Sequence, residues 1–353
     1  MTVYVGVDFH ARQQTISYCN TADGEVHQCE LQHKDNQVRE FYAQFQGEVI
    51  VGLEASGYST WFEELLESMQ YEVWLGNPAE IRRKAPRRQK NDRRDADLIL
   101  ELMLKGDFPQ LHRFSAESRL VLRQLRYRHK LVKVRTIAKN SLQAISLGAG
   151  CSQKRSLLSQ RGQERLRGLA LPPVLGQQRE EWLQMVAQLD KRIATLEATL
   201  EKTAASDEQI KLLRTHPGIG LLTGLVVRHT ITPVARFSTT RKAVAYAGLD
   251  PVEDSSGPRS RLGSISKEGS RLLRFLLNEA GQTACRHDPD LKRFYQRLVH
   301  RRNRQKAKVA VARKLLVRSF IMLRDQIDYA EFLRRGVAAR SARKTYRPSM
   351  PAL

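Results

Sequence analysis

Four acidic residues near the start of the chain stand where catalytic chemistry could use them. Asp8 and Glu54 each directly follow a short apolar run, so both are expected at the ends of buried strands. Asp92 and Asp95 are three residues apart at the start of a predicted helix, a spacing that places them on one helix face. If the two strands are neighbours, this helix can bring all four acids together.

Carboxylates that lie close together repel one another unless a cation neutralises their charge. Oxygen ligands of this kind select Mg²⁺ or Mn²⁺, and two such ions can hold the attacking and leaving oxygens of a phosphodiester. The acids therefore predict a metal site for phosphodiester chemistry. Each acid taken alone also has a structural explanation, because an acid at a strand end can form a turn and Asp92 can cap its helix.

The composition favours a nucleic-acid partner for such a site. The 353 residues include 60 Lys and Arg against 37 Asp and Glu, a net charge of +23. A ribosomal-type protein or a membrane-surface protein are the alternatives. No apolar run approaches the ~18 residues that cross a bilayer, no secretory signal pattern is present, and the four cysteines form no CxxC pair. We expect a cytoplasmic protein without disulfides or structural zinc.

Hydrophobic periodicity predicts the elements that position the acids. Through residue 112 the pattern is strand, strand, strand, helix, strand, helix, strand, helix, with an Asp23-Gly24 hairpin between the second and third strands. A meander followed by crossovers implies a mixed sheet with helices on its faces. Acids at the first and fourth strands and on the last helix are the ribonuclease-H-like layout. The sequence thus predicts such an α/β domain over residues 1–112.

The remaining chain is predicted to be all-α. Residues 113–205 form a basic helical region that opens with a long helix from 116 to about 146. A second helix has an a/d heptad seam between Trp182 and Leu200, typical of a coiled coil. This seam favours an antiparallel hairpin with the first helix, and a dimer contact is the alternative.

Residues 206–330 are predicted to form a helical domain, and the small, basic segment 331–353 a flexible tail. Helices are expected over about 238–247, 266–284 and 290–325.

Basic side chains are candidates for contacts with a nucleic-acid backbone. Several recur at three- and four-residue steps along one face of a predicted helix, which suits tracking of phosphates. Solvated basic faces are common in proteins, and only the net charge sets these apart. The histidines, including His10 beside Asp8, show no ligand spacing and are expected to be non-catalytic. The candidates are Arg87, Arg88, Lys90, Arg119, Arg123, Arg126, Lys130, Arg259, Lys267, Arg301 and Arg304.

The order of short motifs along the chain resembles a known family. Ser256 lies in a loop rich in Ser, Gly and Pro, and by itself is typical of a solvated turn. The matching motifs are Val5-Gly6-Val7-Asp8, Leu53-Glu54-Ala55-Ser56-Gly57, Asn77-Pro78, Lys90-Asn91-Asp92-Arg93-Arg94-Asp95-Ala96, Pro217-Gly218-Ile219-Gly220, Ala245-Tyr246-Ala247-Gly248-Leu249, Ser256-Gly257 and Ile265-Ser266-Lys267-Glu268-Gly269. In this order they resemble the DEDD-type transposases of insertion sequences, which are bridge-RNA-guided recombinases related to Piv-type DNA invertases.

The resemblance implies a RuvC-like domain with four acids, joined to a helical transposase domain with a nucleophilic serine. It also implies donor and target DNA as substrates, a guide RNA encoded by the element, and a dimer that assembles to a tetramer. By position, the implied ligands of Mg²⁺ or Mn²⁺ are Asp8, Glu54, Asp92 and Asp95, and the implied nucleophile is Ser256, with Ser255 as an adjacent rival.

The expected function is therefore that of a transposase or site-specific recombinase that works through a phosphoserine intermediate. Three alternatives remain open. The first is a RuvC-like Holliday-junction resolvase or nuclease that uses water, and the second is a Piv-type invertase without guide RNA. The third is a nucleic-acid-binding protein without enzymatic activity.

Overall fold

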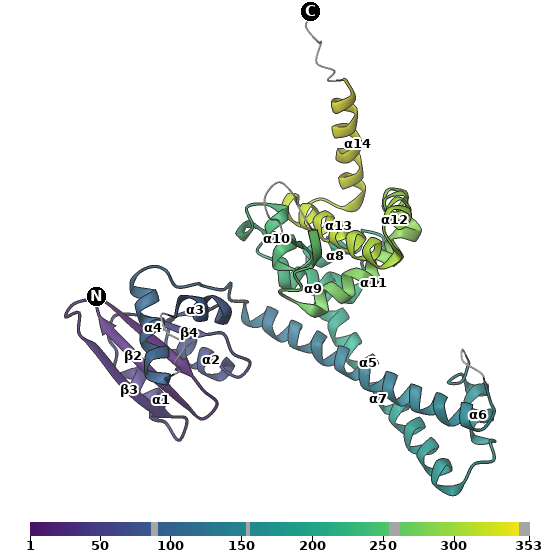
Figure 1. Ribbon diagram of the computed structural model, residues 1–353, viewed down its shortest axis with the longest axis horizontal. Coiled ribbons are helices and arrows are strands. Elements are labelled where there is room, and N and C mark those ends of the chain that lie inside the picture. Colours follow the sequence, from purple (N-terminus) through teal and green to yellow (C-terminus); the bar gives the residue numbers. More distant parts are fainter. Residues whose placement is uncertain (86–90, 153–155, 254–261, 346–353) are drawn as a thin grey trace, which may run out of the picture. The chain divides into compact units, whose positions relative to one another are not determined.

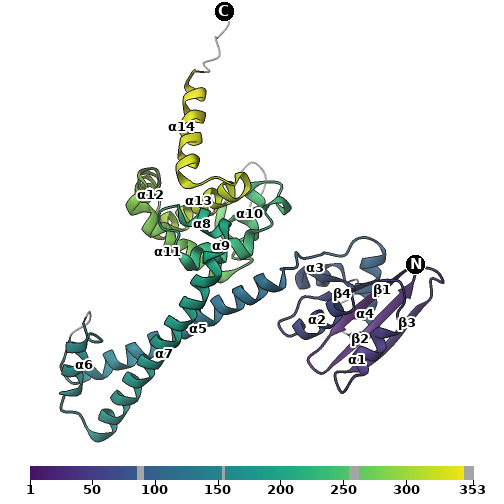
Figure 2. The ribbon, with the colours of Figure 1, turned by 180° about the vertical axis from the view of Figure 1, so that it is seen from behind.

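The computed structural model describes residues 1–85, 91–152, 156–253 and 262–345. The chain divides into two compact units, Met1–Arg113 and Phe114–Leu353, which Figures 1 and 2 show from opposite sides. Among the described residues, no helix combines the length and the apolar character needed to cross a membrane.

A five-stranded mixed sheet forms the centre of the first unit. The elements of this unit are β1 (Thr2–Phe9), β2 (Gln13–Asn20), β3 (Val26–Gln32), α1 (Gln37–Ala43), β4 (Glu48–Glu54), α2 (Thr60–Ser68), β5 (Glu72–Gly76), α3 (Pro78–Lys84) and α4 (Asp92–Leu104). The strand order is β3-β2-β1-β4-β5. Pairing is antiparallel among β1, β2 and β3, and parallel among β1, β4 and β5. The predicted mixed α/β sheet is confirmed, as is the hairpin between β2 and β3.

Side chains alternate between the two faces of the sheet and create two apolar layers. Val5 of β1 and Leu53 of β4 are fully buried on one face, in a cluster with side chains of α1 and α2. On the other face, Ile50 packs against Ile99 of α4. Asp8 lies three residues after Val5. Because successive side chains of a strand point to opposite faces, Asp8 belongs to this second face.

Two glycines allow α4 to lie directly against the sheet. Gly6 and Gly52 are paired in register on β1 and β4. A Cβ atom on Gly6 would lie 2.6 Å from the carbonyl oxygen of Ala96, and one on Gly52 would lie 2.2 Å from the sulfur of Met103. A larger residue at Gly6 would meet the backbone of α4 and push the helix away from the sheet, whereas one at Gly52 would displace the side chain of Met103.

Helix α3 was not predicted from the sequence. Asn77 begins it, because the side-chain oxygen accepts a hydrogen bond from the amide of Ala79 at 3.0 Å. Pro78 occupies the first helical position, where a proline is tolerated. The local signal for this helix was therefore present in the Asn-Pro pair.

The described part of the second unit consists of helices and one short hairpin. The long basic helix predicted from residue 116 is confirmed as the first of them. The elements are α5 (Ala116–Gly148), α6 (Gln160–Arg167), α7 (Pro173–Ala205), α8 (Glu208–Arg214), α9 (Leu221–Ile231), the 3-10 helix η1 (Val234–Arg236), α10 (Thr240–Tyr246), β6 (Pro251–Glu253), β7 (Leu262–Ile265), α11 (Arg271–His287), α12 (Pro289–Arg301), α13 (Arg304–Asp325) and α14 (Tyr329–Thr345).

Helices α5 and α7 pack along each other as an antiparallel pair (Figure 1). Arg128 pairs with Glu197 and Arg135 pairs with Asp190, both at 2.5 Å, so later residues of α5 meet earlier residues of α7. Part of the predicted heptad seam, including Ile193, is buried in this contact. The seam thus packs within the chain, as the hairpin interpretation predicts.

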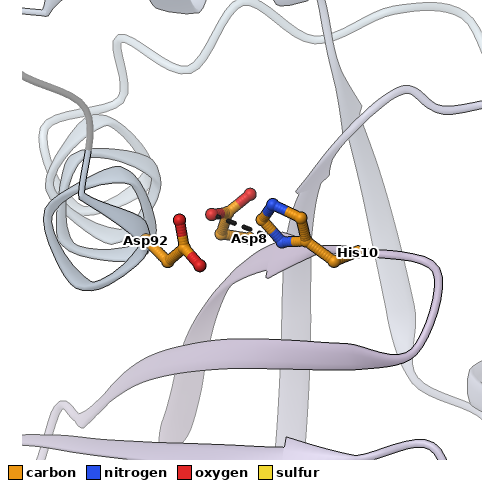
Figure 3. A group of neighbouring side chains, drawn as sticks. All are labelled: Asp8, His10 and Asp92. Carbon is orange, nitrogen blue, oxygen red and sulfur yellow. Dashed lines mark ion pairs between the residues drawn. The ribbon is translucent and has the colours of Figure 1, made fainter.

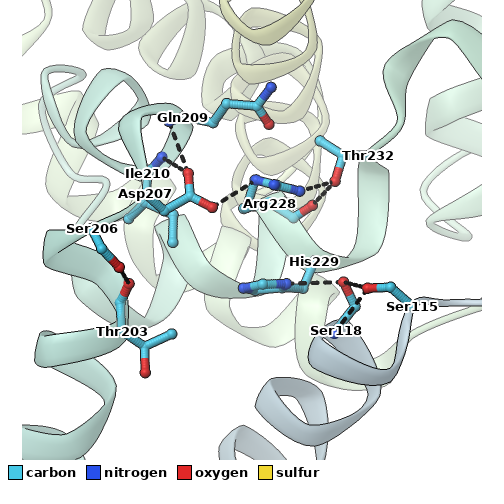
Figure 4. Close-up of polar contacts among 10 residues, drawn as sticks. All are labelled: Ser115, Ser118, Thr203, Ser206, Asp207, Gln209, Ile210, Arg228, His229 and Thr232. Carbon is cyan, nitrogen blue, oxygen red and sulfur yellow. Dashed lines mark hydrogen bonds and ion pairs between the residues drawn. The ribbon is translucent and has the colours of Figure 1, made fainter.

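Polar contacts join this helical pair to α8 and α9 (Figure 4). The hydroxyl of Ser118 in α5 lies 3.0 Å from Nδ1 of His229 in α9. Asp207 accepts hydrogen bonds from the first turn of α8 and pairs with Arg228 of α9 at 2.9 Å. Side chains of α5, α7 and α9 also share one buried apolar cluster. The long helical pair is therefore continuous with the core of the second unit.

The single helix predicted over 290–325 is wrong, because the structure has two helices there. The side chain of Asn303 caps α13 by accepting a hydrogen bond from the amide of Lys306 at 2.8 Å, which separates α13 from α12. Arg301 and Arg304, predicted on one face of one helix, therefore lie on different helices.

The tail expected to be flexible from residue 331 instead continues α14 as far as Thr345. The hydroxyl of Tyr329 donates a hydrogen bond to Oδ2 of Asp288 at 2.6 Å. Asp288 is buried and also pairs with Arg318 of α13, which is buried too. Burial, with the neighbouring carboxylate, raises the pKa of Tyr329 to about 12. A buried ion pair thus anchors the start of this helix.

Candidate active site on the mixed sheet

The ends of β1 and β4 carry two of the predicted acids. The two strands are paired in parallel with Val7 opposite Leu53, so Asp8 and Glu54 are the next residues on adjacent strands. Both follow a residue that is fully buried on the α1 and α2 face. By alternation they belong to the face that α4 covers.

The first turn of α4 carries the other two acids. The side chain of Asn91 accepts a hydrogen bond from the amide of Arg93 at 3.2 Å and so caps the helix. The structural role considered for Asp92 is therefore filled by its neighbour. Asp92 is exposed and Asp95 is half-buried.

Asp8, His10 and Asp92 form a cluster at the strand ends (Figure 3). Each residue offers one ligand atom, and these atoms all lie within 4.8 Å of one another. The negative charges of Asp95 and Glu54 also act on Asp8 and raise its pKa. Of the four predicted acids, the structure thus brings Asp8 and Asp92 into one ligand cluster, and Asp95 and Glu54 act on Asp8 through their charges.

Burial and repulsion oppose ionisation of Asp8. Desolvation raises its pKa from 3.8 to about 6, with further increases from the neighbouring carboxylates and an opposite effect from His10. The Oδ2 atom is buried and accepts no hydrogen bond from the described residues. A cation at this atom would compensate both the burial and the repulsion. The donor set therefore fits a divalent metal ion.

His10 was not predicted as part of this site. Its Nδ1 atom lies 3.7 Å from Oδ2 of Asp8. The available signal was its position two residues after Asp8, since alternate residues of an extended chain project to the same side. Its proximity to Asp92 depends on where α4 packs, and that packing is not visible in a local pattern.

The predicted nucleic-acid contacts are mostly at the surface. Arg119 is half-buried, and its guanidinium donates a hydrogen bond to the carbonyl oxygen of Phe114 at 2.8 Å. The side chains that are exposed are available to a phosphate backbone, and their role stays a prediction. They are Arg123, Arg126, Lys130, Lys267, Arg301 and Arg304.

Other predicted residues lie outside the part of the chain that the structure describes, so their roles also stay predictions. The described strands β6 and β7, which flank the serine loop in sequence, pair antiparallel with Pro251 opposite Ile265. The predicted residues outside the described ranges are Ser256 with its rival Ser255, Arg87, Arg88, Lys90 and Arg259.

Acids at adjacent strand ends, in a chain with a net charge of +23, define a site suited to enzymes that act on nucleic-acid phosphodiesters. Two family models match the chain. The DEDD transposase model of IS110 type matches residues 5–147, which include all four predicted acids. The model described as "Transposase IS116/IS110/IS902 family" matches residues 210–296, which include the serine loop.

Curated relatives agree with these matches. A probable family 20 transposase of Pseudomonas aeruginosa is 28% identical over 300 residues, which are 81% of this chain and 87% of the relative. The transposase for insertion sequence element IS1111A of Coxiella burnetii is 29% identical over 235 residues, 64% of each chain. The transposase for IS1328 of Yersinia enterocolitica is 29% identical over 238 residues, 65% of this chain and 68% of the relative. The chain belongs to the IS110 family of insertion-sequence transposases and is a DNA transposase.

Proposed function

We propose that this transposase cuts and rejoins DNA through a covalent phosphoserine at Ser256, and that Asp8, Glu54, Asp92 and Asp95 hold Mg²⁺ or Mn²⁺. The observation that carries the metal-binding part is the buried oxygen of Asp8 beside Asp92, which accepts no hydrogen bond from the described residues. The strand order, with acids at the ends of β1 and β4, supports a RuvC-like fold of ribonuclease-H type for the first unit.

The serine hydroxyl is the nucleophile in this proposal. A bond forms between Oγ of Ser256 and a backbone phosphorus, and the bond from phosphorus to the leaving sugar oxygen breaks. The phosphoserine ester conserves the free energy of the phosphodiester, so attack by a sugar hydroxyl of another strand restores the backbone without ATP. A bound divalent ion polarises the phosphate and stabilises its additional negative charge. The acids bind and orient that ion.

The partners in this proposal are donor and target DNA and a guide RNA encoded by the element. Exposed Arg123, Arg126 and Lys130 on α5 support contact with a nucleic-acid backbone. The guide RNA, the dimer that assembles to a tetramer, and action at the bacterial nucleoid in the cytoplasm rest on the family resemblance. Sequencing of co-purifying RNA should recover a transcript of the element's non-coding end, whereas recovery of bulk cellular RNA alone would contradict the guide.

Trapping of a denaturation-resistant protein–DNA adduct tests the nucleophile. The wild type and Ser255→Ala should form the adduct and Ser256→Ala should not, because only Ser256 supplies the attacking oxygen. Asp8→Asn should bind DNA but form the adduct about 100-fold more slowly. Asp97→Asn, on α4 but hydrogen-bonded to Gln28 of β3, is the control and should behave as the wild type.

Two results would overturn this proposal. An adduct that persists in Ser256→Ala would place the nucleophile elsewhere. Strand cleavage without any adduct would favour a RuvC-like nuclease or Holliday-junction resolvase that uses water.

A further inference from the structure

We propose that His10 binds the same divalent ion as Asp8 and Asp92 through a ring nitrogen, so that the metal site has one nitrogen ligand in addition to its oxygens. This inference rests on the metal site in the proposed function and adds to it a residue outside the four acids. It changes the expected metal preference of the enzyme.

The backbone of His10 is fixed by the turn that joins β1 to β2. The His10 amide donates a hydrogen bond to the carbonyl oxygen of Gln13 at 2.9 Å. The imidazole is 47% exposed and can adjust, whereas the carboxylate of Asp8 is only 16% exposed. In Figure 3 the carboxylate of Asp8 is seen between the ring of His10 and the carboxylate of Asp92. A fixed backbone and an adjustable ring suit a ligand that completes a site as an ion enters.

The distances also fit shared coordination better than a direct contact. Nδ1 of His10 lies 3.7 Å from Oδ2 of Asp8, which is longer than a hydrogen bond of about 3 Å. Ligand atoms around one octahedral ion with bonds of about 2.1 Å lie roughly 3 to 4 Å apart. The three ligand atoms are all within 4.8 Å of one another, and His10 and Asp92 are both exposed and free to close the difference.

The oxygen of Asp8 that lies nearest to His10 is the one without a hydrogen bond. Oδ2 of Asp8 is buried and receives no hydrogen bond from the described residues. A histidine that served only to neutralise Asp8 would be expected to donate directly to this atom. The observed separation of 3.7 Å is instead one that two ligand atoms of the same ion can have.

A nitrogen ligand alters which ions bind well. Mg²⁺ prefers oxygen ligands, whereas imidazole favours later first-row metals and is accepted by Mn²⁺. We therefore expect His10→Ala to weaken Mn²⁺ binding by about tenfold and Mg²⁺ binding by no more than about twofold. The ratio of the two affinities is a readout that does not depend on strand transfer.

The decisive measurement is pulsed electron paramagnetic resonance of the full-length protein loaded with Mn²⁺. The wild type should show coupling to a directly bound ¹⁴N nucleus, and His10→Ala and His10→Gln should lose it. His27→Ala is the matched control, because His27 is 49% exposed and lies 3.9 Å from Glu25, a similar histidine–carboxylate pair away from Asp92.

The outcomes separate the two proposals. Mn²⁺ that binds the wild type without ¹⁴N coupling, or a coupling that survives in His10→Ala, would overturn the role of His10 and leave the acidic metal site in place. Failure of the wild type to bind Mn²⁺, together with the same failure in Asp8→Asn, would overturn the metal site itself.

Discussion

At the scale of single residues, Asp8 combines burial with negative charge. Its pKa in the folded protein is about 6 against an ordinary value of 3.8. Between these values the folded state binds a proton more readily than the unfolded chain does. The protonated carboxyl therefore contributes stability at low pH, and that contribution is lost as the pH rises from about 4 to about 6.

Removing this charge should stabilise the metal-free protein. We expect Asp8→Asn to raise the free energy of unfolding at pH 7 by about 2 kcal/mol, because asparagine has the same shape without the charge. The gain should shrink as the pH falls below 6. Urea unfolding in the presence of a chelator at pH 7 and pH 5 measures both effects.

The control for this prediction is Asp23→Asn, in the exposed turn between β2 and β3, which should leave stability unchanged. Equal or lower stability of Asp8→Asn at pH 7 would contradict the assignment of an unfavourable buried charge.

The four acids could be predicted because each follows a local rule. Asp8 and Glu54 follow apolar strands of period two, and Asp92 and Asp95 share a helix face. His10 could not be assigned in this way. Its importance depends on the distance to Asp92, which is 82 positions later in the sequence, and only the packing of α4 on the sheet determines that distance.

At the scale of elements, the position of α4 depends on Gly6. We expect Gly6→Ala to destabilise the first unit by about 2 kcal/mol, because the added Cβ would meet the carbonyl oxygen of Ala96 at 2.6 Å. Displacement of α4 should also move Asp92 away from Asp8 and weaken Mn²⁺ binding. Thermal unfolding and Mn²⁺ titration check the two effects.

Gly148→Ala serves as the matched control, because a Cβ there would meet nothing within 4 Å. If Gly6→Ala bound Mn²⁺ as tightly as the wild type, close packing of α4 would not be what assembles the site.

The element predictions that failed have identifiable physical causes. The apolar and basic pattern over 290–325 continues across Asn303, so the helix break depends on one capping side chain within an otherwise helical segment. The start of α14 is anchored by Tyr329, whose hydrogen-bond partner Asp288 is remote in sequence. Local periodicity contains neither signal. The five strands of the first unit, the Asp23-Gly24 turn and the long helix α5 were predictable from local patterns, whereas the short strands β6 and β7 were not predicted.

At the scale of the whole molecule, the net charge of +23 favours association with polyanions. This attraction arises largely from release of counterions and weakens with added salt. Each basic side chain that contacts a phosphate makes the DNA-binding constant fall more steeply with salt concentration. The slope therefore reports how many phosphate contacts a given face of the protein makes.

We test this with the combined variant Arg123→Gln, Arg126→Gln and Lys130→Gln and one fixed DNA duplex. The logarithm of the DNA association constant falls linearly with the logarithm of the salt concentration, and we expect the variant to make this slope shallower by about 2 to 3. Fluorescence anisotropy titrations between roughly 50 and 200 mM salt measure this slope. The control variant removes the same charge from α7 through Lys191→Gln, Arg192→Gln and Lys202→Gln, all exposed. Equal slopes in the two variants would show that α5 has no special contact with DNA.

The buried carboxylate of Asp288 connects three helices. It accepts a hydrogen bond from the amide of Leu291 at the start of α12, pairs with Arg318 of α13, and accepts the hydroxyl of Tyr329 at the start of α14. Truncation of the chain before Tyr329 would expose the buried ion pair between Asp288 and Arg318 to water. The start of the final helix is therefore tied to the core through Tyr329, and a fusion partner is better tolerated after this residue than in place of it.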